Sequence, residues 1–488
     1  MKKIAKKIAV LIMLAAFAAS SLCACSGTND GGSGQNSSIQ ENTGGASSQN
    51  SIVQENAGGA SGQNSGEPEN TGGASASGSL RLLSNRYDES ACNTENGYYY
   101  LTGEISELRD GEYGSHLMYM DFASGREIYL CSTAGCQHDS LDCPSVFSYD
   151  DFPTYSTILF IFRDQLYILS REYDDDGSMS QSVMDFGGGP SENQPAALYR
   201  ANLDGTGREK IYTFDAALTL EDKVVGNDKG IYVITKKLSV EKSGGLSYTE
   251  SSERKLMFFD LDSLSLTEVC SMDFGDGISW RILGCSQNDF VLCGTDFGRE
   301  LSRDEIWDDN AYKELYLNSS EVYALLSQSG GKPEEIIRQP NRDENSVKIL
   351  GGSLYLSTRE NPNIDVLDLK TGERKTLCAL PQNYLMDTLG ETLCCRGWDL
   401  AGETVWYFVN TKTGEITHSP MVNLCNGWAL EFRCETAEDV LFIYDYDATG
   451  YKDGSYEIHQ YRHALISKDD LFSGNENYRT IEMAGPGK

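Results

Sequence analysis

The sequence has 488 residues, of which 39% are hydrophobic and 23% charged, a composition that supports a large folded core. Acidic residues outnumber basic ones by 73 to 40, which gives a formal net charge of −33 at pH 7. A field of this sign repels phosphate backbones, and the sequence shows no basic patch, so nucleic acid is excluded as a partner. The 49 Gly and 27 Tyr, against 11 Pro, favour short strands and turns over helices.

Residues 1–24 are predicted to be a lipoprotein signal peptide. Four lysines in the first seven residues precede the apolar stretch Ile8–Leu22, which has the length of a secretory signal. The following Leu22-Cys23-Ala24-Cys25 resembles the lipobox of bacterial lipoproteins. That resemblance implies cleavage before Cys25 and two or more acyl chains, such as palmitate, on this cysteine, enough for stable membrane anchoring. An ordinary cleaved signal and an uncleaved membrane helix are the alternatives.

Residues 25–79 are predicted to be the lipidated cysteine followed by a flexible linker. Three copies of a 14-residue unit, rich in Gly, Ser, Asn and Gln, occupy Ser33–Ala46, Ser47–Ala60 and Ser61–Ala74. Each copy holds at most two large apolar residues, too few for a core. Such a tether would span about 40 Å as a random coil. We therefore expect an extracytoplasmic location, with the folded region held off the cell membrane at the cell surface.

Residues 80–488 are predicted to form an all-β domain built from a repeated sheet. An apolar strand, a turn and a second strand that ends in an Asp, Gly or Thr turn recur seven times, with copies near Gly97, Gln165, Gly230, Asp289, Gly352, Glu391 and Val440. Seven four-stranded units without intervening helices predict a single seven-bladed β-propeller. Six or eight blades, or two β-sandwiches, are the rival architectures, and repetition of one unit argues against sandwiches.

The Leu203-Asp204-Gly205-Thr206-Gly207 turn resembles the turn between the third and fourth strands of low-density-lipoprotein-receptor-type and TolB-like propellers. With the lipobox, the whole chain resembles a loosely defined group of bacterial cell-surface lipoproteins, which implies a fold but no activity. The turn matches well in one blade and loosely in the others. The Trp307-Asp308 and Trp398-Asp399 pairs lack the context of the WD-repeat signature.

Loop lengths predict which face of the propeller is functional. With the strands of a blade named A to D, the B–C loops and the D–A links between blades share one face. The B–C segments are long in five blades, and long loops on a rigid scaffold usually carry function. They are 103–116, 174–194, 239–254, 297–320 and 445–456. Within the fourth, Ser302 and Glu305 form a capping box that predicts a helix to about Leu315.

A metal or disulfide site is predicted in the first D–A link. Cys131, Cys136, His138 and Cys143 are spaced C-x4-C-x-H-x4-C, and three thiols with one imidazole are the donor set of a tetrahedral Cys3His zinc site. A disulfide with one spare thiol is the alternative, which a secreted location favours. Most other cysteines lie in apolar strand-like stretches, as small hydrophobic residues do.

Asp445, Asp447, Thr449 and Asp453 follow the start of a calcium-binding loop of the EF-hand type, D-x-D-x-T-G. The final position is Tyr456 instead of Glu, so a plain hairpin turn is the alternative.

The sequence contains no nucleophile elbow, phosphate-binding loop or zinc-protease motif, and no carboxylate pair stands out among 73 acidic residues. This pattern favours a non-enzymatic, lipid-anchored binding module that presents a loop-rich face to a protein or glycan ligand. An exported carbohydrate-active enzyme, either a glycosidase or a lyase, is the first alternative. An envelope assembly scaffold is the second.

Overall fold

The computed structural model describes residues 78–103, 106–109, 111–148, 152, 157–171, 195–243, 247–299, 301–302, 305–306, 308–342, 346–358, 361–380, 384–398, 404–450 and 456–484. The predicted signal peptide, Cys25, the linker and the segment 174–194 lie outside these residues, and the statements about them stay predictions.

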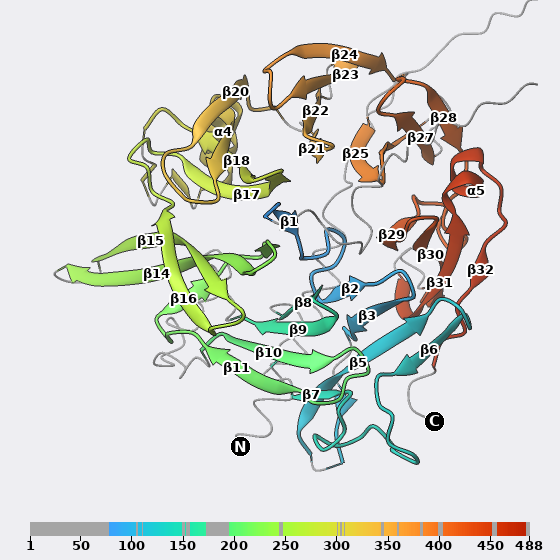
Figure 1. The fold of residues 1–488 in the computed structure, drawn as a ribbon. Coiled ribbons are helices and arrows are strands. Elements are labelled where there is room, and N and C mark those ends of the chain that lie inside the picture. Colours follow the sequence, from blue (N-terminus) through green and yellow to red (C-terminus); the bar gives the residue numbers. More distant parts are fainter. Residues whose placement is uncertain are drawn as a thin grey trace, which may run out of the picture. The chain divides into compact units, whose positions relative to one another are not determined.

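Seven antiparallel sheets are arranged around a ring, which confirms the predicted seven-bladed β-propeller (Figure 1). Each sheet contains four main strands in chain order from the centre outward, and two sheets carry two further short strands each. Blades 1 to 3 contain β2 (Ala91–Asn93), β3 (Gly97–Leu101), β5 (Tyr113–Asp121) and β6 (Arg126–Tyr129); β8 (Thr157–Phe162), β9 (Gln165–Ser170), β10 (Ala197–Asn202) and β11 (Glu209–Thr213); and β13 (Val225–Gly226), β14 (Gly230–Ser243), β15 (Ser247–Asp260) and β16 (Ser265–Ser271).

Blades 4 to 7 repeat this order and contain β17 (Ser279–Ser286), β18 (Asp289–Asp296), β19 (Ser320–Ser327) and β20 (Glu334–Pro340); β21 (Ser346–Leu350), β22 (Ser353–Thr358), β23 (Asn361–Asp368) and β24 (Arg374–Ala379); β25 (Tyr384–Leu389), β26 (Thr392–Trp398), β27 (Thr404–Asn410) and β28 (Ile416–Ser419); and β29 (Glu431–Glu435), β30 (Asp439–Gly450), β31 (Tyr456–Ser467) and β32 (Arg479–Thr480). Short strands β4 (Ser106–Glu107) and β7 (Val146–Ser148) pair with β5, and β12 (Leu218–Leu220) pairs with β14.

The hydrophobic core lies between neighbouring blades, because the inner strands are buried on both faces. Successive side chains of a strand point to opposite faces of its sheet. In β8, Ile158 and Phe160 belong to a core cluster shared with blade 3, whereas Leu159 belongs to one shared with blade 1. All three side chains are 0% exposed. This two-sided burial explains why the inner strands read as continuous apolar runs in the sequence.

Residues 80–90 cross the centre of the ring before the first blade begins (Figure 1). Strand β1 (Arg81–Leu82) pairs with β13, on the inner edge of blade 3. Further along, the side chain of Asn85 donates to the Arg433 carbonyl of blade 7 over 3.0 Å, and Arg86 is ion-paired with Glu435. The segment therefore connects inner strands on opposite sides of the ring.

The C-terminal residues close the ring against blade 1. The amide of Glu127 in β6 donates to the carbonyl of Glu482 over 2.9 Å, and the amide of Glu482 donates to the carbonyl of Gly125 over 2.8 Å. The Ala484 amide donates to the side-chain Oε2 of Glu127 over 2.9 Å. The four main strands of every blade come from one continuous segment of the chain, so no blade combines strands from both ends of the propeller domain. The tail after β32 instead connects blade 7 to blade 1.

The helices in the described part of the chain lie outside the sheets. Helix α4 (Asp309–Leu317) forms part of the B–C segment of blade 4, and α5 (Lys468–Ser473) follows β31. The predicted capping box forms, because the Ser302 amide donates to Glu305 Oε2 over 2.9 Å. Glu305 and Ile306 are helical after this box, and α4 then begins after an N-cap of its own, Asp308, so the predicted single helix is divided in two. None of the helices within the described ranges is both long and apolar enough to span a bilayer.

Candidate functional site

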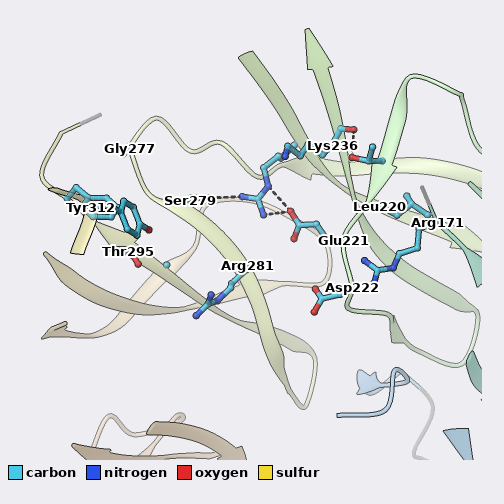
Figure 2. Close-up of a pocket in the computed structure, with 14 residues that line it drawn as sticks. Arg171, Leu220, Glu221, Asp222, Lys236, Gly277, Ser279, Arg281, Thr295 and Tyr312 are labelled. Atoms are coloured by element: carbon cyan, nitrogen blue, oxygen red, sulfur yellow. Dashed lines mark hydrogen bonds and ion pairs between the residues drawn. The ribbon is translucent and has the colours of Figure 1, made fainter. Parts of the chain in front are cut away.

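A cavity of about 550 Å³ lies on the face of the propeller that carries the B–C loops and D–A links, over blades 2 to 4 (Figure 2). The long-loop face predicted from the sequence is therefore hollowed among the described residues of these three blades. The cavity has an unusually basic lining for so acidic a chain, with four basic and two acidic side chains: Arg171, Lys236, Arg254, Arg281, Glu221 and Asp222.

Three neighbouring blades place these charged groups together. Arg171 directly follows β9, and Arg281 lies in β17, the innermost strand of blade 4. Lys236 and Arg254 face each other across the β14–β15 pair, at the level where this long hairpin rises from blade 3. Glu221 belongs to the link that enters blade 3 after β12.

The two carboxylates of the cavity are already engaged by basic partners. Arg254 Nε donates to Glu221 Oε1 over 2.7 Å, and its Nη1 donates to Ser279 Oγ over 3.3 Å (Figure 2). Asp222 is ion-paired with Lys223 at 2.8 Å. Burial raises the pKa of Glu221 although Arg254 opposes this shift. Glu221 therefore offsets the charge of Arg254, whereas the partner of Asp222 is Lys223, which lies outside the lining, and the basic side chains of the lining still outnumber the acidic ones by four to two.

Arg281 is the cation best placed to meet a ligand. Its Nε donates to Cys293 Sγ over 3.1 Å, and within the described residues it forms no ion pair with a carboxylate. Arg171 is held differently, because its Nη2 contacts Glu89 Oε2 of the central segment at 2.8 Å while its buried Nε has no hydrogen-bond partner among the described residues. An exposed guanidinium presents several donors in a planar fork that matches a carboxylate.

An aromatic pair forms one wall of the cavity. Phe297 follows β18, and Tyr312 lies on α4, with their ring centroids 5.9 Å apart. Tyr312 is 37% exposed, so its ring offers apolar surface to a ligand beside the basic groups. Helix α4 therefore contributes directly to the site, as expected for an insertion in a long B–C loop.

The Cys131, Cys136, His138 and Cys143 side chains converge, with one ligand atom from each lying within 4.8 Å of the others. None of the twelve cysteines in the described part of the chain is disulfide-bonded. The cluster follows β6, the outermost strand of blade 1, and none of its residues lines the cavity over blades 2 to 4. A second cavity, of about 540 Å³, lies beside Cys131 and His138.

The calcium-loop residues are placed in a strand and not in a loop. Asp445, Asp447 and Thr449 lie in β30, which stays paired with β31 as far as Gly450. The Thr449 hydroxyl and His459 Nε2 are 2.7 Å apart, and Asp445 lies 3.8 Å from Arg462. An EF-hand loop needs a sharp turn at its glycine, whereas Gly450 is still extended here. Asp453 lies outside the described residues, and the calcium site stays a prediction.

The basic residues of the cavity were missed from the sequence, because no run of Lys and Arg marks them. They belong to three different blades, and they lie close together only because these blades are neighbours in the folded propeller. Strand position gives no signal either, because Lys236 and Arg254 lie in the middle of β14 and β15.

No protein-family model matches the sequence, and no curated protein matches it. Solved structures to which the chain is similar include a puromycin hydrolase, with 13% identity and a TM-score of 0.46. The match covers 82% of this chain and 53% of the hydrolase. An oligogalacturonate lyase in complex with manganese has 13% identity, TM-score 0.38 and coverage of 75% of this chain and 87% of that one. TolB from Acinetobacter baumannii has 13% identity, TM-score 0.31 and coverage of 78% and 79%. The chain spans about half the length of the puromycin hydrolase.

Proposed function

We propose that this chain is a lipid-anchored, extracytoplasmic binding protein that holds an acidic oligosaccharide in the cavity over blades 2 to 4. One observation carries the proposal: the cavity has four basic and two acidic side chains in a protein of net charge −33. A basic site within an acidic surface attracts an anionic ligand locally and repels anions elsewhere. Cys25 would hold the protein at the membrane.

The chemistry of the lining supports this ligand class. Arg281 would pair with a sugar carboxylate through two parallel hydrogen bonds, the geometry that a guanidinium favours. The exposed ring of Tyr312 would cover the apolar face of an adjacent sugar ring. An acidic glycan uses both groups at once.

The arrangement of the carboxylates supports binding over hydrolysis. A glycosidase needs two carboxyl groups flanking the scissile bond, one of them free to donate a proton. Glu221 and Asp222 are neighbours in the chain, and each is ion-paired with a basic residue. They are therefore better suited to orienting Arg254 and Lys223 than to acid–base chemistry.

A glycan array tests the proposal, using the purified full chain in detergent against uronic-acid, neutral and amino-sugar oligosaccharides. We expect binding to uronic-acid glycans, weakening with added salt as the charges are screened. Arg281→Gln should lower the affinity at least tenfold, which corresponds to about 1.4 kcal/mol. The matched control is Arg163→Gln, because Arg163 lies in the A–B turn of blade 2, on the other face, and pairs with Asp262 at 2.7 Å.

Equal affinity for neutral glycans, or no effect of Arg281→Gln in a correctly folded variant, would contradict the proposed ligand. Preference for poly-glutamate over every glycan would replace it with an acidic peptide. The anchor is tested separately by labelling cells with an alkynyl fatty acid. The wild type should be labelled and Cys25→Ala should not.

A further inference from the structure

The four side chains at Cys131, Cys136, His138 and Cys143 have the spacing of ligands to one ion. His138 Nδ1 and Cys143 Sγ are 3.3 Å apart, and all four ligand atoms lie within 4.8 Å of one another. Around a tetrahedral zinc ion, bond lengths of about 2.3 Å to sulfur and 2.0–2.1 Å to nitrogen put these two atoms about 3.6 Å apart. The observed separation is close to this value without an S–S bond in the cluster.

The backbone is shaped to deliver these ligands from a short segment. His138 adopts a left-handed conformation with φ of 55°, which is uncommon for a residue with a side chain, and Gly135 has φ of 72°. The Cys136 amide donates to the Thr133 carbonyl over 3.2 Å, and the Cys143 amide to the Ser140 carbonyl over 3.0 Å. Two tight turns therefore point the thiols and the imidazole inward.

Groups outside the cluster fix the orientation of its ligands. The Tyr129 ring stacks on His138 with centroids 4.4 Å apart, and His116 Nε2 lies 2.8 Å from the His138 carbonyl. Ser145 Oγ lies 3.1 Å from Cys143 Sγ, where it can donate to a thiolate. Such surrounding contacts are typical of metal sites, in which they hold the ligands ready for the ion.

We propose that Cys131, Cys136, His138 and Cys143 bind one Zn²⁺ in a closed, structural Cys3His site. Three thiolates and a neutral imidazole fill the four positions of tetrahedral zinc, which leaves no open position for substrate. The thiols release their protons on binding, and no electron is transferred. Thiolate ligands favour zinc or iron over calcium or magnesium, and redox-inert zinc suits a site that holds a loop in place.

The site would hold the segment that links blade 1 to blade 2. Beyond the last ligand, the Pro144 and Val146 carbonyls each accept a hydrogen bond of 3.2 Å from Arg208 of blade 2. The Arg208 guanidinium lies 4.1 Å from the centre of the Phe147 ring. The ion would thus hold residues 131–143 of this link, and Arg208 contacts the residues that directly follow. This inference is independent of the glycan proposal, since the two sites share no lining residue.

Elemental analysis of the full chain, purified under reducing conditions, tests the proposal directly. We expect one zinc per chain, removal by a strong chelator with a lower thermal midpoint, and recovery of that midpoint when zinc alone is added back. Cys136→Ser combined with His138→Ala should lower zinc content at least tenfold, whereas His138→Cys should retain it. Cys425→Ser is the matched control, because Cys425 is exposed and outside the cluster, and should leave zinc content unchanged.

The chelation experiment uses the wild-type chain and therefore does not depend on whether a variant folds. Iron in place of zinc, or a metal-free protein with three titratable thiols in the cluster, would overturn the proposal. So would a disulfide between two of these cysteines in non-reducing peptide mapping, or full zinc content in the double variant.

Discussion

At the scale of single residues, His463 is a buried group whose protonation state matters for stability. It lies in β31, its side chain is 6% exposed, and its Nδ1 has no hydrogen-bond partner among the described residues. Burial, and then the nearby positive charge of Arg433, lower the pKa of His463 to about 3. The folded protein therefore keeps this imidazole neutral at every pH at which the chain is expected to work.

This burial predicts a loss of stability in acid. An unfolded histidine takes up a proton near pH 6.5, whereas the folded one does so only near pH 3, so the unfolded state binds more protons between these values. The free energy of unfolding should therefore fall as pH decreases, with His463 contributing a loss of about 2 kcal/mol between pH 7 and pH 5. Urea unfolding at the two pH values should show a smaller difference for His463→Gln than for the wild type.

The control for that measurement is His418→Gln, because His418 is exposed on β28. It should keep the wild-type pH dependence. An identical pH dependence in His463→Gln and the wild type would show that the buried imidazole is not the cause.

Single residues were the hardest level to predict from the sequence. The Cys131–Cys143 cluster was recognisable because its four ligands lie within one short segment, and local spacing is visible in a sequence. The cavity residues Arg171, Arg254 and Arg281 come from three blades, and their proximity depends on how the ring closes. Their positions could not be read from local patterns.

At the scale of elements, the inner strands require glycine where two backbones approach closely. Gly230 is the first residue of β14 and pairs with Asp260. A Cβ atom at this position would lie 2.1 Å from the carbonyl oxygen of Phe259, a backbone atom that cannot swing away.

Gly230→Ala should therefore destabilise the protein by about 1–3 kcal/mol, the usual range for overpacking. The measurement is the free energy of unfolding in urea. Gly450→Ala is the matched control, because a Cβ there would meet nothing within 4 Å in a strand of blade 7, and its effect should stay within about 0.5 kcal/mol. Equal stability of the two variants would contradict the close approach at Gly230.

Strand positions were predictable because burial on both faces leaves a plain apolar signal, as in Gln165–Ser170 and Gly230–Thr235. Elements that deviate from the repeat were harder to predict from the sequence. The Asp445–Gly450 stretch has the composition of a metal-binding loop but continues as a strand, since pairing with β31 satisfies its backbone groups. Ser302 and Asp308 likewise cap two successive helical stretches, where the sequence predicts one helix to about Leu315.

At the scale of the whole molecule, ring closure depends on the few residues after β32. Ile481 is 5% exposed in the core between blades 1 and 7, and Glu482 forms two backbone hydrogen bonds with blade 1. These few contacts connect the last blade of the propeller to the first.

Truncation after Thr480 should therefore lower stability by about 6 kcal/mol, from loss of Ile481 burial at about 2 kcal/mol and of four hydrogen bonds, including that from the Ile481 amide to the His463 carbonyl, at about 1 kcal/mol each. It would also leave the carboxylate of Glu127 without the Ala484 amide. Thermal unfolding followed by circular dichroism measures the change. Truncation after Ala484 keeps all of these contacts and should leave the midpoint unchanged; a similar drop in both variants would show that the tail does not close the ring.

The blade number followed from counting a repeated unit, because each repeat is one sheet that must bury both faces against its neighbours. The closing device did not follow, since neither the tail nor residues 80–90 belong to any repeat. The blades that these two segments contact are far away in the sequence, and the composition of the segments does not indicate which blades these are.

The central path of residues 80–90 has a mechanical consequence. Tension applied through the residues before Leu80 reaches the ring at its inner edge and not at an outer strand. It is then shared by the pairing of β1 with β13, the bond from the Leu80 amide to the Gln287 carbonyl at 2.7 Å, and the contacts of Asn85 and Arg86 with blade 7. Residues 80–90 would have to leave the centre before the four strands of any blade bear the load.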